Sequence, residues 1–283
     1  RYLQQIAERG WGARFLGRRV DRRAAGGSEF VGHSDYTSGD DIRYIDWPIC
    51  ARHDELLTRQ YRGSEDRVVY LMIDGSAGMR LGSPAKFAVA QQLAATLGYI
   101  ALDNLDRVGV VLVSDRILDE APPLRGRRNV PRLVRSIENL SPDAARVHLL
   151  RSVEAFVQNR PRRGLTVVLS DLFDPDGFEP AIDLLAKRGF APYLVQIVAP
   201  EERAPRMNGN VALVEAGSGR RRGAFLEPVD RENYQQVFSE FSEGCRRYGA
   251  RRGIGLIQTD TQTSISDSVE RIIRTCTSRM AAR

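Results

Sequence analysis

The chain carries the sequence Val68-Val69-Tyr70-Leu71-Met72-Ile73-Asp74-Gly75-Ser76. Its six apolar residues are uninterrupted and end in a polar turn, a pattern typical of a strand that is buried on both faces of a sheet. Similar apolar runs at 108–114, 165–170 and 190–198 alternate with segments of helical spacing such as 84–104. This alternation predicts a doubly wound, mostly parallel α/β sheet with helices on both faces.

Length and composition fit one such domain with an added N-terminal segment. The 283 residues are 42% hydrophobic and 28% charged, which allows a sizeable core and excludes a disordered tail, a fibrous repeat and a disulfide-stapled miniprotein. We predict an N-terminal extension over residues 1–66 and the α/β domain over residues 67–283, because the strand and helix pattern begins only there. No apolar run approaches the roughly 20 residues of a membrane-spanning helix.

The cysteines indicate the redox compartment of the protein, and the basic residues indicate what its surface can bind. Cys50, Cys245 and Cys276 are odd in number and far apart, which favours reduced thiols in the cytoplasm and argues against a zinc site. All but two of the 42 basic residues are arginines, the exceptions being Lys86 and Lys187, and the formal net charge is +6. Arginine pairs recur without interleaved aromatic residues. This pattern favours solvated faces whose arginines pair with the 36 acidic residues. A surface that binds nucleic acid is the less favoured interpretation, and both remain open.

Polar residues follow two of the predicted strands. Asp74 and Ser76 come directly after the first strand, and Asp171 comes directly after the strand at 165–170. In a parallel sheet, ligands bind at the carboxyl ends of the strands, and Mg²⁺ takes carboxylate, hydroxyl and water oxygens. The sequence therefore predicts a divalent-cation site at these three residues. The alternative is structural: the two aspartates cap helices and accept hydrogen bonds from loop amides.

At these residues the chain resembles the von Willebrand factor A domain, whose metal-ion-dependent adhesion site reads Asp-x-Ser-x-Ser, with a Thr and an Asp from later loops. Asp74, Ser76 and Asp171 match, whereas Gly78 replaces the second Ser and Ala145-Arg146-Val147 offers no hydroxyl at the Thr position. The resemblance implies a degenerate site that binds Mg²⁺ or Mn²⁺ weakly. Arg146 could instead place its positive charge at the position of the ion.

A second motif lies upstream, in the string Gly39-Asp40-Asp41-Ile42-Arg43-Tyr44-Ile45-Asp46-Trp47. It resembles the signature of the domain of unknown function fifty-eight family, which precedes a von Willebrand A domain, and Lys86 also fits that family's pattern. Many genes of the family lie beside genes for MoxR-type AAA+ ATPases, which implies a partner role in complex assembly or metal-centre maturation. The signature residues that we single out are Asp40, Asp41, Arg43, Asp46 and Trp47.

The charged and aromatic residues of this string fit a segment that fastens the N-terminal extension to the α/β domain. We expect Asp41 and Asp46 to accept hydrogen bonds from Arg43 or Arg52. We expect Trp47 to be buried as an anchor against the α/β domain, with Ile45 beside it. A structural clasp is favoured over a ligand site.

The sequence favours a non-enzymatic protein-binding or adaptor module, with a MoxR-type AAA+ ATPase as its partner. We assign no catalytic residue, because the chain has no Gly-x-Ser-x-Gly elbow, no P-loop and no dinucleotide fingerprint. Two alternatives stay open: a metal-dependent phosphoester hydrolase that uses Asp74 and Asp171, and nucleic-acid binding through the arginine pairs.

Overall fold

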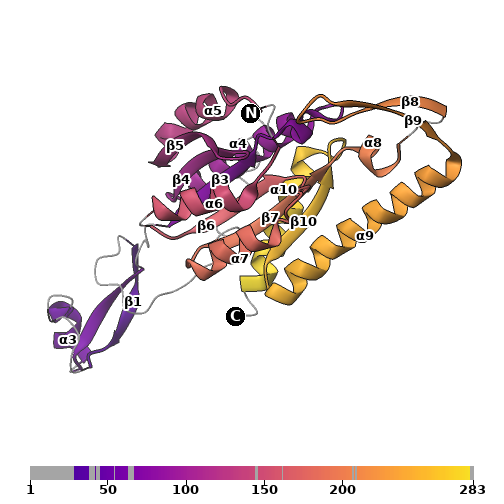
Figure 1. Cartoon of the computed structure of the whole chain (residues 1–283). Helices are drawn as coiled ribbons and strands as arrows, with labels where there is room; N and C mark the ends of the chain where they lie inside the picture. The colour runs from indigo at the N-terminus through magenta and orange to yellow at the C-terminus, as the bar shows by residue number, and fades with distance from the viewer. Residues whose placement is uncertain are drawn as a thin grey trace. The chain divides into compact units, whose positions relative to one another are not determined.

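The computed structural model describes residues 29–37, 42, 45–53, 55–62, 67–143, 146–160, 162–205, 207 and 209–280. The chain divides into two compact units, one at Arg18–Arg67 and a larger one that contains Val68–Arg283 (Figure 1). Among the residues described, no helix combines the length and the apolarity needed to cross a membrane.

A six-stranded sheet forms the centre of the larger unit, with the strand order β10-β7-β6-β3-β4-β5. All neighbouring strands are parallel except β5, which runs antiparallel to β4 at one edge. This confirms the predicted doubly wound, mostly parallel sheet. The strands are β3 (Val68–Asp74), β4 (Arg107–Val113), β5 (Ile117–Arg125), β6 (Leu165–Ser170), β7 (Ala191–Val198) and β10 (Gly255–Asp260).

Helices cover both faces of this sheet, and β3 shows why its sequence is apolar throughout. Val69, Leu71 and Ile73 pack into a core with α4, α5 and α10, whereas Val68 and Tyr70 belong to a second core with α6, α7 and α9 on the opposite face. Successive side chains of a strand point to opposite faces, so a strand covered on both sides must be apolar at every position. The helices are α4 (Lys86–Asp103), α5 (Val130–Glu138), α6 (Leu149–Gln158), α7 (Glu179–Lys187), α9 (Pro228–Arg252) and α10 (Ile265–Met280).

Two smaller features connect β7 to α9. The short helix α8 (Pro200–Arg203) begins at the carboxyl end of β7. An antiparallel hairpin of β8 (Gly209–Val214) and β9 (Arg221–Leu226) follows it.

The smaller unit is an antiparallel hairpin with one helix, made of β1 (Glu29–Asp35), α3 (Trp47–His53) and β2 (Leu57–Arg62). Asp46, which precedes α3, is buried and accepts hydrogen bonds at 2.8 Å from both His33 Nε2 and Arg59 Nε. Arg59 Nη2 adds a bond of 3.1 Å to the other carboxylate oxygen. Asp46 therefore ties the segment before α3 to both strands of the hairpin.

The structure describes only some of the signature residues. Asp40, Asp41 and Arg43 lie outside the described residues, and so does the predicted pairing of Asp46 with Arg43. Within its own unit Trp47 is 63% exposed, and its burial against the α/β domain stays a prediction. Trp47 is the first residue of α3 and points away from the hairpin core, whereas Ile45 and Asp46 are the buried members of the string.

Candidate functional site

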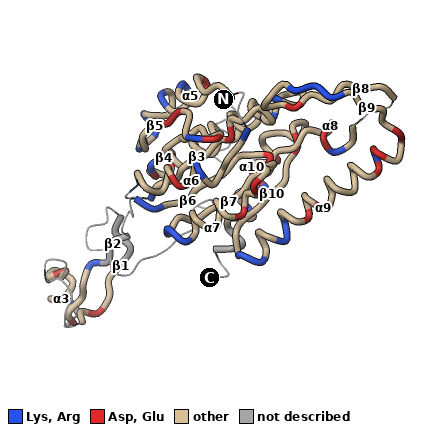
Figure 2. Tube along the Cα trace, viewed as in Figure 1, with Lys and Arg blue, Asp and Glu red and all other residues tan. Residues whose placement is uncertain are grey.

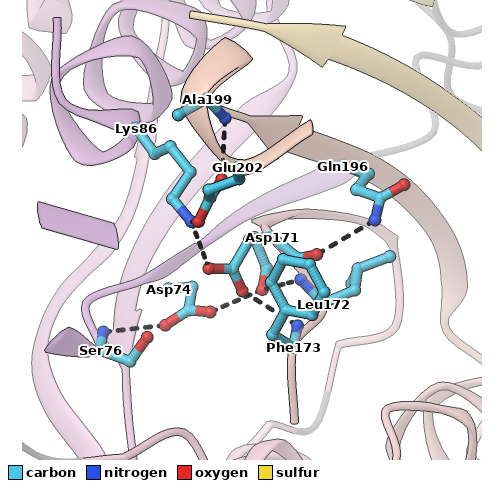
Figure 3. A network of polar contacts seen from close by, with 10 residues as sticks. Asp74, Ser76, Lys86, Asp171, Leu172, Phe173, Gln196, Ala199 and Glu202 are labelled. Atoms are coloured by element: carbon cyan, nitrogen blue, oxygen red, sulfur yellow. Dashed lines mark hydrogen bonds and ion pairs between the residues drawn. The ribbon is translucent and has the colours of Figure 1, made fainter. Parts of the chain in front are cut away.

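The predicted site residues lie where β3 and β6 end. These strands are parallel neighbours, with Ile73 paired to Leu169, so their carboxyl ends lie side by side. Asp74 is the last residue of β3, and Asp171 follows the last residue of β6. Both carboxylates and Ser76 are buried (Figure 3).

Each oxygen of Asp74 already has a donor. Oδ1 accepts a hydrogen bond of 2.8 Å from the Ser76 backbone N–H, and Oδ2 accepts one of 2.6 Å from Ser170 Oγ. Ser170 Oγ in turn accepts a bond of 2.9 Å from the Leu172 N–H. Burial and the nearby charge of Asp171 raise the pKa of Asp74 to about 6. Asp74 thus organises the two strand-exit loops.

A lysine supplies the cation of the site. Lys86, the first residue of α4, is fully buried, and its Nζ donates to Asp171 Oδ2 at 2.7 Å and to Glu202 Oε1. Glu202 on α8 is held by the Ala199 N–H, which donates to its Oε2 at 2.8 Å. Burial alone would lower the pKa of Lys86, but the charges of Asp171 and Glu202 raise it above its ordinary value. The ammonium is therefore charged and sits between two carboxylates.

This donor set does not fit a divalent ion in its present arrangement. Asp171 Oδ2 is taken by the Lys86 ammonium, and Oδ1 accepts a bond of 3.0 Å from the Phe173 N–H. A Cβ on Gly78 would lie 3.1 Å from Asp171 Oδ2, so the missing second serine of the adhesion motif belongs beside the same oxygen. A divalent cation there would share Asp171 with the positive charge of Lys86, which repels it. The weak Mg²⁺ or Mn²⁺ binding that the resemblance implies for Asp74, Ser76 and Asp171 is thus untested, and the Lys86–Asp171 ion pair argues against it.

The third loop of the motif does not supply a cation to Asp171. Ala145 lies outside the described residues, and Arg146 forms an ion pair with Glu215. The suggestion that Arg146 fills the ion position is therefore wrong, because Lys86 reaches Asp171 from beneath the strand ends.

A second group of possible metal ligands lies on the same loops. The ligand atoms of His148, Asp174 and Asp176 are all within 4.8 Å of one another, and His148 Nδ1 lies 2.8 Å from Asp176 Oδ2. Asp174 Oδ2 also accepts a hydrogen bond of 2.8 Å from the Leu149 N–H at the start of α6. Sequence analysis did not connect these residues. Exposed groups of this kind are common without an ion, and their contacts explain them as a loop and helix cap.

Aromatic side chains surround the loop that Asp171 begins. Phe173 is 37% exposed and stacks on Phe241 of α9, with 4.7 Å between ring centroids and an interplanar angle of 20°. It also contacts Phe238, at 5.9 Å between centroids, and Tyr234 lies 6.3 Å from Phe238. Lys86 Nζ lies 5.8 Å from the centroid of the Phe173 ring. The buried ion pair and an exposed aromatic cluster are therefore adjacent.

Sequence reasoning missed Glu202 and the role of Lys86. A usable signal existed for each: Glu202 follows the carboxyl end of β7, and Lys86 is one of two lysines among 42 basic residues. Lysine has a slender stem and a compact ammonium, which fit a buried position that a planar guanidinium would not.

Comparisons with known proteins agree with this fold and extend over most of the chain. The profile of the family described as "Protein of unknown function DUF58" matches residues 33–248. Uncharacterized proteins of Mycobacterium tuberculosis and Mycobacterium bovis are 24% identical over 206 residues, which is 71% of this chain. The match covers 65% of each of these relatives, so the chain spans less than two thirds of their length.

Similar solved structures share less sequence with this chain. The conserved hypothetical protein BatB from Bacteroides thetaiotaomicron is 14% identical with a TM-score of 0.47, over 76% of this chain and 99% of BatB. Proximal thread matrix protein 1 from the mussel byssus, solved with a zinc-occupied MIDAS motif, is 11% identical with a TM-score of 0.45, over 75% of this chain and 48% of that protein.

Proposed function

The chain belongs to the family Protein of unknown function DUF58, and from this premise we propose that it is a non-enzymatic protein-binding module. Its binding surface is the aromatic cluster at the strand-exit loops, made of Phe173, Tyr234, Phe238 and Phe241, together with the exposed Val237 of α9. The observation that carries this proposal is that Phe173 is exposed on the loop that the Lys86–Asp171 ion pair fixes from below.

The exposure of this cluster is what a binding surface requires. Tyr234 is 44% exposed and Val237 is 65% exposed, and both lie on the first half of α9, whose Phe238 and Phe241 contact Phe173. Aromatic side chains that are exposed together on a pre-formed surface are the residues that contribute most to protein–protein binding. Because Phe173 stacks on Phe241, it is held in place before a partner arrives, which lowers the entropy lost on binding.

A divalent ion is not needed for this mode of binding. In the proposal, Lys86 takes the electrostatic role of the ion: it neutralises Asp171 and holds the strand-exit loop in one conformation. Lys86 is fully buried and cannot reach a partner, so contact with the partner falls to the aromatic side chains.

The partner that we propose is a MoxR-type AAA+ ATPase, as the family resemblance implies. The phosphoester hydrolase alternative finds less support. Ser170 Oγ donates to Asp74 and accepts from Leu172, so it is engaged in holding the loops. The His148–Asp176 pair has no contact with Asp74 or Asp171 within the part of the chain that the structure describes.

The test is a double variant, Phe173→Ala with Val237→Ala, titrated against the purified MoxR-type ATPase. Loss of two exposed hot-spot side chains should weaken binding by about 2–4 kcal/mol, or roughly 30-fold or more, without unfolding the chain.

The matched control is Leu105→Ala. Leu105 is 59% exposed but precedes β4, at the opposite end of the sheet from the strand exits. The control should bind like the wild type. Equal affinities for the double variant and the control would show that the aromatic cluster is not the interface, and turnover of a phosphoester abolished by Asp74→Ala would establish the enzyme instead.

A further inference from the structure

A groove runs along the open edge of the central sheet. β10 pairs with β7 on one side, and within the described residues no strand pairs with its other side. A cavity of about 580 Å³ lies against this edge, and five consecutive residues of β10, Leu256 to Asp260, line it. Residues of α8, α9 and α10 form its other walls. Most of the lining lies beyond residue 248, where the match to the family profile ends.

The walls of the groove are strongly basic. Four arginines line it, Arg203 from α8, Arg246 from α9, and Arg271 and Arg274 from α10, and Asp260 is the acidic residue among the lining. Basic positions along α8 and α9 are blue in Figure 2. Arg274 pairs with Glu270 at 2.5 Å, so part of the charge is balanced locally.

Two of these guanidinium groups have neutral acceptors. Arg246 Nε donates to the side-chain Oε1 of Gln258 at 2.6 Å, and Arg271 Nη2 donates to the backbone carbonyl of Gln258 at 3.0 Å. A hydrogen bond to a neutral oxygen leaves the positive charge uncompensated, and a carboxylate is the stronger partner for arginine. The groove therefore favours an anionic ligand.

The same contact shows how the edge of β10 is oriented. The Gln258 carbonyl is bound by Arg271, so it points into the groove and not toward β7. The N–H and C=O of one strand residue point to the same side, and alternate residues share that side. Leu256 and Gln258 therefore present backbone groups to the groove, as an edge strand does when it pairs with a further strand. The Asp260 carbonyl accepts a hydrogen bond of 3.2 Å from the Thr263 N–H, so the accessible edge ends before it.

We propose that this groove binds an extended acidic segment of a partner protein, which adds to β10 as a further strand. Its backbone would pair with the edge of β10, and its Asp or Glu side chains would bind Arg246 and Arg271. This mode combines affinity from main-chain hydrogen bonds with specificity from side chains. A nucleic acid offers the anionic charge but has no main-chain groups to continue the sheet, so the edge strand favours the peptide. The inference does not depend on the proposed function.

The experiment uses fluorescence anisotropy with the whole chain and a labelled peptide of about eight residues, the length of a typical strand. Its sequence alternates pairs of Glu with pairs of Val, so that acidic side chains project from both faces of the strand, toward Arg246 of α9 and toward Arg271 of α10. The groove variant is Arg246→Gln with Arg271→Gln. Loss of two charge-assisted contacts should weaken peptide binding by about tenfold or more. The matched control, Arg247→Gln with Arg251→Gln, removes the same charge from exposed positions of α9 that do not line the groove, and it should bind like the wild type.

Two further probes separate the peptide from other anions. The same peptide with methyl groups on alternate backbone nitrogens should bind at least about tenfold more weakly, because it cannot pair with an edge strand. Equal binding of the methylated peptide, or equal weakening by the groove and control variants, would overturn the proposal. The proposal would also be overturned if a single-stranded oligonucleotide of equal charge bound more tightly than the peptide and displaced it.

Discussion

Lys86 is buried at the strand-exit site, beside the carboxylate of Asp171. Its ammonium lies 2.7 Å from Asp171 Oδ2 and also binds Glu202, whose other oxygen is held by a backbone N–H. A buried ion pair need not stabilise a protein more than apolar residues would, but removal of one partner leaves the other charge uncompensated in the interior. The effect of removing Lys86 is thus a direct measure of its role.

We predict that Lys86→Met lowers the free energy of unfolding by about 3–5 kcal/mol at neutral pH, because two buried carboxylates lose their counter-charge. Urea denaturation at neutral pH measures this loss. The control is Lys187→Met, which removes the other lysine, an exposed residue of α7, and should change stability by less than about 0.5 kcal/mol. A Lys86 variant as stable as the control would refute the assignment.

At the scale of single elements, the hairpin unit shows how one carboxylate can fix a loop. The bonds from Arg59 and His33 hold the pKa of Asp46 well below its ordinary value. Because the folded pKa is lowered, the stability that Asp46 contributes is fully present above about pH 4, the ordinary aspartate value, and is lost as the pH falls through the lowered value.

We therefore predict that Asp46→Asn increases hydrogen exchange of the β1 and β2 amides at neutral pH, while the amides of β3 and β6 keep their protection. In the wild type, the same loss of protection should occur only when the pH falls well below about 4. Exchange measured by mass spectrometry on hairpin peptides checks this. Asp35→Asn, an exposed carboxylate of β1, is the control and should leave the exchange unchanged.

The elements differ in how far sequence predicts them. The parallel strands could be located because burial on both faces makes them continuously apolar, as in β3. β5 was missed because it is a half-exposed, antiparallel edge strand that contains Pro122 and Pro123, residues that interrupt a strand pattern. Trp47 was predicted to anchor its segment on the α/β domain, and within its own unit it begins a short helix and is exposed.

For the molecule as a whole, the sequence predicted the two carboxylates of the site, but it did not predict that Lys86 is the cation between them. Parallel neighbouring strands bring Asp74 and Asp171 together, and this follows from sequence once the strands are ordered. Lys86 is 85 positions from Asp171, and its reach depends on how α4 packs beneath the strand ends. The aromatic cluster similarly requires the packing of α9 beside the Asp171 loop, which no spacing within the sequence reveals.

The two proposed surfaces lie close together on the larger unit. Glu202, which binds the Lys86 ammonium, and Arg203, which lines the groove, are consecutive residues of α8. The two proposals are tested with different variants, so one can be refuted while the other is supported.

The central claim is that Lys86, and not a divalent ion, supplies the cation at the strand-exit site. Its most direct test is titration calorimetry of Mn²⁺ into the wild-type chain, with Asp74→Ala as the comparison. We predict no saturable heat from this site up to about 1 mM Mn²⁺, the range of weak protein sites, and identical curves for the two proteins. Saturable binding of one ion per wild-type chain that Asp74→Ala abolishes would contradict the account and restore the metal site.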